Sequence, residues 1–169
     1  MGFFDKMASA MTGQNSETSV ENRKRINELF AEKVPEADQY EVLAAFRTVE
    51  KTKIGMSVLT GKRNVEITYF NYILGFRREP EMEFVLIDVS PDLNTVGNPI
   101  VLKKSASKAK KTLQGLYQIE NAGLEDGKIA FGPIANAAIG AVNSGYIIKV
   151  AYDTQTLQDL KNFFEEFSK

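Results

Sequence analysis

The chain has 169 residues, of which 43% are hydrophobic and 25% are charged, and its formal net charge is −1. This composition is ordinary for a soluble globular protein, and so small a net charge gives no overall field to attract nucleic acid or an anionic membrane. Cysteine, histidine and tryptophan are absent, which excludes zinc-finger ligation, Cys–His nucleophilic pairs and Ser–His–Asp triads.

The N-terminal residues 1–17 are expected to form a tail or a short amphipathic segment ahead of a single globular domain at residues 18–169. Its apolar residues share one stripe of a helix and are candidate contacts with a membrane surface or a partner: Phe3, Phe4, Met7 and Met11. Alternatively, the segment folds back on the domain or frays. It lacks the features of a secretory signal, and the chain has no apolar run long enough to span a bilayer, so we expect a cytoplasmic protein.

A helix is expected from Thr18 to about Lys33. Thr18 and Glu21 have the spacing of a capping box, and Pro35 is placed to end the helix. Its expected apolar face consists of Val20, Ile26, Leu29, Phe30 and Val34.

From Tyr40 onwards the pattern changes to that of strands. Residues 40–49 fit either a helix or a strand, and the alternation of their side chains favours a strand. Residues 55–60 and 65–76 are expected to pair with each other. A bend or bulge is expected near Asn71, where the alternation is displaced.

A hairpin is expected from residues 82–89 and 99–102, because the residues between them are rich in turn formers. Consecutive strands joined by short turns predict an antiparallel sheet rather than strand–helix–strand units.

Residues 105–121 carry apolar side chains at helical intervals and are expected to form a helix, although Gly115 would lie in its interior. A short strand is expected at residues 128–131. Residues 132–145 are small and apolar, and they either begin a short helix at Pro133 or form a loop that permits close backbone approach.

The C-terminal quarter of the chain has the clearest pattern. Residues 146–152 are β-branched and aromatic, which predicts a well-buried strand. Asp153 or Thr154 is expected to cap a following helix, whose single apolar face consists of Leu157, Leu160, Phe163, Phe164 and Phe167. The expected fold is therefore α+β, with a mostly antiparallel sheet closed by a C-terminal amphipathic helix and with an N-terminal helix.

The sequence YIIKVAYD at residues 146–153, followed by TQTLQDLKNFFEEF, resembles the closing unit of pleckstrin-homology-like domains, including bacterial members. LTGKR at residues 59–63 is similar to a strand turn of the bacterial members. The resemblance covers at most residues 40–167 and implies a scaffold for binding. The chain departs from it in lacking the tryptophan common in the closing helix, and no Lys-x-Arg pair for phosphoinositide headgroups follows Lys51 and Lys53.

Five lysines within nine residues form a candidate anion-binding cluster: Lys103, Lys104, Lys108, Lys110 and Lys111. Such a density of cations can hold phosphate or an acidic partner, whereas the alternative is a solvated surface, which is the usual place of charge runs. No glycine-rich phosphate loop accompanies the cluster.

Two other groups of residues are candidates for chemistry. The aromatic residues Tyr69, Phe70, Tyr72 and Phe76 fit a base-stacking platform, although core packing is favoured. The carboxylates Glu79, Glu81, Glu83, Asp88 and Asp92 are candidates for acid–base work or a divalent ion, but nothing in the sequence places any two of them at working distance, and the calcium-loop pattern is missing.

These patterns favour a non-enzymatic binding or interaction module without a metal or cofactor. A protein partner or an anionic surface is the expected ligand, nucleic acid is disfavoured, and self-association stays open. The alternative is a small enzyme or small-molecule binder that uses carboxylates and tyrosines near residues 132–145.

Overall fold

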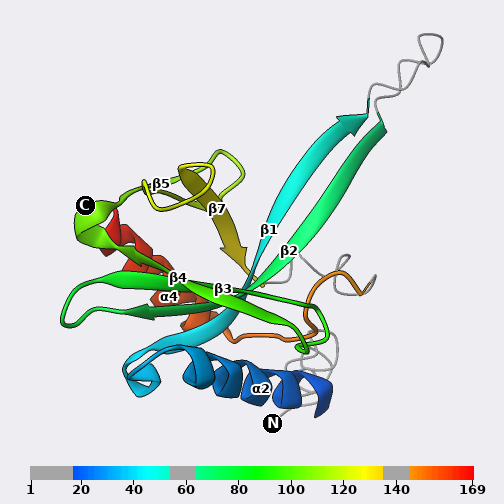
Figure 1. Ribbon diagram of the computed structural model, residues 1–169, viewed down its shortest axis with the longest axis horizontal. Coiled ribbons are helices and arrows are strands. Elements are labelled where there is room, and N and C mark those ends of the chain that lie inside the picture. The colour runs from blue at the N-terminus through cyan, green and yellow to red at the C-terminus, as the bar shows by residue number, and fades with distance from the viewer. Residues whose placement is uncertain (1–16, 54–63, 135–144) are drawn as a thin grey trace.

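The computed structural model describes residues 17–53, 64–134 and 145–169 (Figure 1). These residues form an α+β fold with a seven-stranded antiparallel sheet, an N-terminal helix and a C-terminal helix, which confirms the expected class. The candidate contacts Phe3, Phe4, Met7 and Met11 lie outside the described residues, as do residues 55–60 and 59–63. No helix of the described part is long and apolar enough to cross a membrane.

The sheet has the strand order β4-β3-β2-β1-β7-β6-β5. The helical elements are α2 (Glu17–Lys33), the 3-10 turns η1 (Ala37–Gln39) and η2 (Lys104–Ala106), and α4 (Thr154–Phe167). The strands are β1 (Glu41–Lys53), β2 (Asn64–Arg77), β3 (Glu83–Val89), β4 (Val96–Lys103), β5 (Lys108–Lys111), β6 (Tyr117–Glu120) and β7 (Lys128–Pro133).

Helix α2 buries Ile26, Leu29 and Phe30 against one face of the sheet, as expected. Its first turn differs from the expectation: Val20 is half exposed, and Ser19 is buried in its place. Thr18 lies inside the described helix, so the expected capping box is wrong. The helix ends at Lys33, two residues before Pro35.

Strands β1 and β2 pair along their whole length, from Glu41↔Phe76 to Lys53↔Asn64. Residues 65–76 therefore pair with β1, and their expected partner, residues 55–60, lies outside the described residues. The register runs one to one past Asn71, which contradicts a bulge there. Asn71 instead marks the point where β2 parts from β3.

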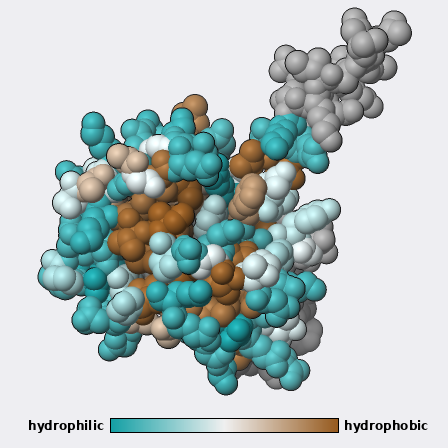
Figure 2. Space-filling model, viewed as in Figure 1, coloured by the Kyte–Doolittle hydropathy of each residue, from teal (hydrophilic) through white to brown (hydrophobic). Residues whose placement is uncertain are grey.

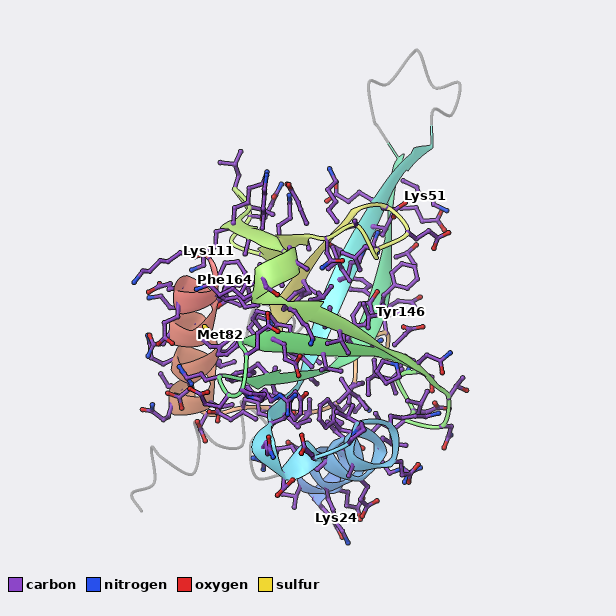
Figure 3. The ribbon with its side chains drawn as sticks, turned by 60° about the vertical axis from the view of Figure 1, so that its left-hand side comes forward. Lys24, Lys51, Met82, Lys111, Tyr146 and Phe164 are labelled. Atoms are coloured by element: carbon purple, nitrogen blue, oxygen red, sulfur yellow. The ribbon has the colours of Figure 1, made fainter. Side chains whose placement is uncertain are left out.

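Beyond that point the two strands leave the body together as a two-stranded projection, here called the arm (residues 47–53 and 64–70; Figure 1). Figure 3 places Lys51 on the arm, Tyr146 beside its base and Lys24 at the opposite end of the molecule.

The hairpin of β3 and β4 confirms the prediction for residues 82–102. Its turn is held by the Ser90 hydroxyl, which accepts a hydrogen bond of 2.9 Å from the Thr95 N–H.

The expected helix at residues 105–121 is wrong, because this region forms η2 and the hairpin of β5 and β6. Gly115 has a φ of +79° in the turn between these strands, a conformation that glycine adopts at little cost. The apolar residues do not share one helical face: Ala109 packs against the core beside exposed lysines, and Leu113 is fully exposed. Strand β7 confirms the short strand expected at residues 128–131, and it also includes Pro133, so no helix begins there.

Both faces of the central strands are covered, which explains the unbroken apolar run of β3. On one face Ile73, Val85 and Ile87 pack with α2. On the other face Leu74, Phe84 and Leu86 pack with α4. Gly75 allows α2 to approach closely, because a Cβ there would lie 2.2 Å from the Phe30 ring.

Residues 146–152 are not a strand, although Ile147, Ile148 and Val150 are buried as expected. Side chains bind their main chain instead of a neighbouring strand. Asn71 donates to the Tyr146 carbonyl at 3.0 Å and accepts from the Ile148 N–H at 3.1 Å. The physical reason is that β1 already has β2 on one side and β7 on the other, so the segment has no edge to join there.

Helix α4 confirms the prediction for the C-terminus. Asp153 is its N-cap and accepts a hydrogen bond of 2.7 Å from the Thr156 N–H, which lowers the pKa of the Asp153 carboxyl. The buried face consists of Leu160, Phe163, Phe164 and Phe167, with Leu157 half-buried at its start.

Candidate functional site: the groove between β1 and β7

Strands β1 and β7 meet at only two residue pairs, Ala45↔Pro133 and Phe46↔Gly132. Beyond Phe46, β1 departs with β2 into the arm, while β7 stays beside β6 (Figure 1). A groove of about 400 Å³ lies between the parted strands. We call it the β1–β7 groove. Its walls are formed by Arg47, Thr48, Val49 and Glu50 of β1 and, opposite them, by Leu116, Gln118, Asp126, Lys128 and Ala130.

The main-chain N–H and C=O groups of two β1 residues point into this groove. The Ala44 carbonyl accepts from the Ile134 N–H at 3.1 Å, and the Ala44 N–H donates to the Tyr152 hydroxyl at 2.9 Å, so Ala44 points away from β2. Because main-chain groups alternate in direction along a strand, Thr48 and Glu50 point the same way. In the described part of the chain, neither residue has a strand partner on that side.

The main chain of β7 points back across the groove by the same reasoning. Ile134 bonds to β1, so Ala130 and Lys128, at even spacing from it, also point toward β1. If the register of the two existing pairs continued, Thr48 would face Ala130 and Glu50 would face Lys128. Neither pair forms, and the groove therefore has a strand edge on each wall.

The closed end of the groove is packed around Gly132. A Cβ at this residue would lie 2.9 Å from Leu116 Cδ2 and 3.5 Å from the Phe46 ring. Glycine is required here because two side chains cross over the β7 backbone. The Leu116 side chain thereby forms an apolar floor where the strands begin to part.

One ion pair crosses the groove, from Arg47 to Asp126 at 3.6 Å. Both side chains reach solvent, so the pair contributes little stability and can be exchanged for another partner. Burial raises the pKa of the nearby Tyr72 hydroxyl, and the Arg47 guanidinium opposes that rise. Glu50 and Lys128 also line the groove, so its walls carry two positive and two negative side chains and have no net charge. A ligand would therefore be held mainly by the main-chain groups of the two strands.

The five candidate lysines do not converge on one point. Lys103 pairs with Glu81 at 3.6 Å, Lys110 pairs with Glu120 at 3.0 Å, and Lys104 donates to the Glu166 carbonyl at the end of α4 at 2.7 Å. The Lys111 amine lies 5.5 Å from the centre of the Tyr117 ring. Lys108 is exposed beside a shallow hollow of about 450 Å³ that also includes Ser105 and Asn121. Anion binding by this cluster stays a prediction.

The aromatic residues of β2 do not form one platform. Tyr72 and Phe76 are buried in the core, whereas Phe70 is exposed. Tyr69 lies on the opposite face of the strand and stacks on Tyr146, with ring centres 6.2 Å apart.

The candidate carboxylates likewise serve separate contacts. Glu83 is buried, lies 2.8 Å from the Arg77 Nε and accepts a hydrogen bond from the Tyr40 hydroxyl. Glu81 accepts from the Ser105 N–H at 3.2 Å, and Asp92 lies in the turn after β3. Among the described residues, no group of three or more acidic side chains is placed to hold a metal ion.

The groove residues were not among the candidates found by sequence. The one signal was the glycine-containing segment from residue 132, which indicated close backbone approach. Comparison of the chain with protein-family models, curated proteins and solved structures gives no match.

Proposed function

We propose that the protein is a non-enzymatic binding module that holds an extended segment of a partner protein in the β1–β7 groove by strand addition. One observation carries the proposal: two strand edges face each other across the groove, without strand partners among the described residues. Unpaired strand edges are templates for another strand.

The affinity would come from main-chain hydrogen bonds. Thr48 and Glu50 each present one donor and one acceptor, and each bond made contributes about 0.5–1.5 kcal/mol net. Both edges are held by strands that are already paired on their other side, β1 by β2 and β7 by β6. Because both edges are already ordered, the protein loses little conformational entropy when it binds a segment.

The groove also limits what can enter. Its volume of about 400 Å³ is at the small end of ligand pockets and suits a few residues of extended chain. Val49, Leu116 and Ala130 offer apolar contacts. Because the walls carry these apolar side chains together with two positive and two negative ones, we expect the bound segment to alternate small apolar with polar side chains. The resemblance to pleckstrin-homology-like domains also implies a binding scaffold. Of the closing unit that carries this resemblance, helix α4 is present, but residues 146–152 are not a strand.

The test begins with selection of peptides from a random displayed library on the full chain. The best peptide is then titrated into ¹⁵N-labelled protein. We expect amide shifts centred on Thr48, Glu50, Lys128 and Ala130. Shifts centred on the exposed lysines, or no selected peptide at all, would contradict the proposal.

A matched pair of proline variants sharpens the test. Thr48→Pro removes an N–H that points into the groove and leaves the β1–β2 ladder intact, so we expect Kd to rise about tenfold or more. Ile67→Pro is the control. Ile67 faces Glu50 in the register, so its main chain points away from β1, toward the outer side of the arm. Ile67→Pro should bind like the wild type, and equal binding by Thr48→Pro would show that the groove edge is not used.

A further inference from the structure

The sheet has three strand edges on its outside, and they differ in how they are protected. The β4 edge carries Pro99, and the β5 edge carries Lys108, Lys110 and Lys111. Proline and lysine are the residues by which edge strands avoid pairing with other chains. The third edge is the outer side of β2 in the arm.

This third edge has neither proline nor lysine in its described part, where Glu66 is the one charged residue. Residues 67–70 are Ile, Thr, Tyr and Phe, of which Ile67 is 46% exposed and Phe70 is 40% exposed. Strand β3 reaches only as far as Asn71↔Val89, so the described residues include no strand beyond β2 along the arm (Figures 1 and 3). Figure 2 shows apolar surface on the arm below its hydrophilic end.

The alternating direction of the N–H and C=O groups along β2 identifies which residues of the arm point them outward. Ile73 faces Ala44 in the register, and Ala44 points away from β2, so Ile73 points toward β3. Residues at even spacing from Ile73 share this direction. The outward main-chain groups of the arm are therefore those of Val65, Ile67 and Tyr69.

We propose that a second copy of the chain pairs antiparallel with this edge, about a two-fold axis at Ile67. Ile67 is the midpoint of residues 64–70, so this register uses all three outward-facing residues of the arm. Ile67 then faces Ile67 of the second copy, and Val65 faces its Tyr69. These three outward pairs form about six main-chain hydrogen bonds, two for each pair. A two-fold axis uses the same surface on both copies, as in most homodimers.

The edge is self-complementary in charge and shape. In this register Glu66 faces Thr68 of the second copy, so no like charges meet. Ile67 and Tyr69 lie on one face of the arm, and the stacked ring of Tyr146 continues that face at its base. Pairing therefore joins two apolar stripes into one surface. This argues for a second copy of the chain as the occupant.

The absence of cysteine from the chain allows a direct test. Ile67→Cys places the only thiol at the proposed axis, where the two Cα atoms would be about 5.5 Å apart. A short bis-maleimide should convert this variant to a covalent dimer, of twice the 18.8 kDa chain mass. The matched control is Val101→Cys on the β4 edge, whose side chain is 48% exposed, and it should stay monomeric. Equal cross-linking of both variants would overturn the proposal.

Light scattering during size exclusion gives an independent measurement without a cross-linker. The wild-type chain should have the mass of two copies at high concentration and of one copy on dilution. Ile67→Lys should have the mass of one copy throughout, with an unchanged melting temperature. A wild-type chain that stays monomeric at every concentration would refute the proposal, as would a dimer that survives Ile67→Lys.

The Thr48→Pro variant separates this inference from the proposed peptide binding. It changes only the inner edge of the arm, so it should dimerise like the wild type. If Ile67→Lys binds selected peptides normally as a monomer, the two surfaces act independently.

Discussion

Arg77 and Glu83 face each other across β2 and β3, and the Arg77 Nε lies 2.8 Å from a Glu83 oxygen although only 4% of the Glu83 side chain is exposed. The Nε–H does not point along this contact, so the interaction is an ion pair rather than a hydrogen bond. The Arg77 guanidinium also covers the Tyr40 ring at 4.7 Å and reaches Glu36 at 3.2 Å. This cluster joins the segment before β1 to the ends of β2 and β3 that flank the turn between them.

Loss of the Glu83 carboxylate should therefore destabilise the fold strongly. Glu83→Ala removes the carboxylate that pairs with the Arg77 guanidinium and leaves the Tyr40 hydroxyl without its acceptor, and we expect a loss of about 3 kcal/mol in urea unfolding. Glu83→Gln retains an acceptor and should lose less. Glu125→Ala is the control, because Glu125 is exposed in the turn before β7, and it should unfold close to the wild type. A neutral Glu83→Ala would show that the cluster is dispensable.

The pH dependence of stability should report the buried Tyr152 hydroxyl. Burial raises its pKa from 10.0 to about 12. The folded state then holds this proton more tightly than the unfolded state. Its contribution is complete below pH 10 and is lost as the pH rises toward 12, by about 3 kcal/mol.

Tyr152→Phe separates this effect from the titration of other groups. At neutral pH the variant should be about 1 kcal/mol less stable, because the Ala44 N–H loses its acceptor. Between pH 10 and pH 12 the stability of the wild type should fall by more than this difference, so the two curves cross and the variant becomes the more stable protein. Parallel curves over this range would mean that Tyr152 titrates normally.

The closing helix should be the main source of stability on its face of the sheet. Phe163 is fully buried, with its ring centre 4.9 Å from those of both Phe76 and Phe84. Phe163→Ala should cost about 3–5 kcal/mol, and Phe164→Ala a similar amount. Lys161→Ala on the outer side of the helix should cost little. If both phenylalanine variants unfolded like the wild type, the packing described here would be wrong.

Vesicle binding tests the lysine cluster predicted from sequence. If the cluster binds anions, a triple change of Lys108, Lys110 and Lys111 to Glu should abolish retention on vesicles with anionic lipid at low salt. The control is the same charge reversal at Lys24, Lys33 and Lys149, which are exposed elsewhere. Equal retention of all three proteins would leave the lysines as edge protection for β5.

Much of the fold could be predicted from local patterns. Helix α4 and the β3–β4 hairpin follow from apolar spacing, a cap and turn residues that lie close together in the sequence. The structure of residues 105–121 could not be predicted in this way, because Ala109 and Leu113 fit a helical interval by chance. Gly115, which lies in the turn between β5 and β6, was the better indication of a hairpin. Residues 146–152 have the composition of a strand, but burial alone does not provide a neighbouring edge, and the Asn71 side chain binds them instead.

The candidate site was hidden from sequence for a different reason. The groove exists because β1 and β7, more than seventy residues apart, pair at Phe46 and Gly132 and then part. Neither Thr48 nor Ala130 is an unusual residue for a strand. What distinguishes them is the direction of their main-chain groups, which depends on the register with distant strands.

The central claim is that the groove accepts an extended segment by main-chain hydrogen bonds. Nuclear Overhauser contacts between a selected peptide and the labelled protein test it most directly. We expect contacts between the peptide backbone and the amides of Thr48 and Glu50, spaced as in paired strands, together with slowed exchange of those two amides. Peptide contacts with side chains alone, with exchange at Thr48 and Glu50 unchanged, would contradict it.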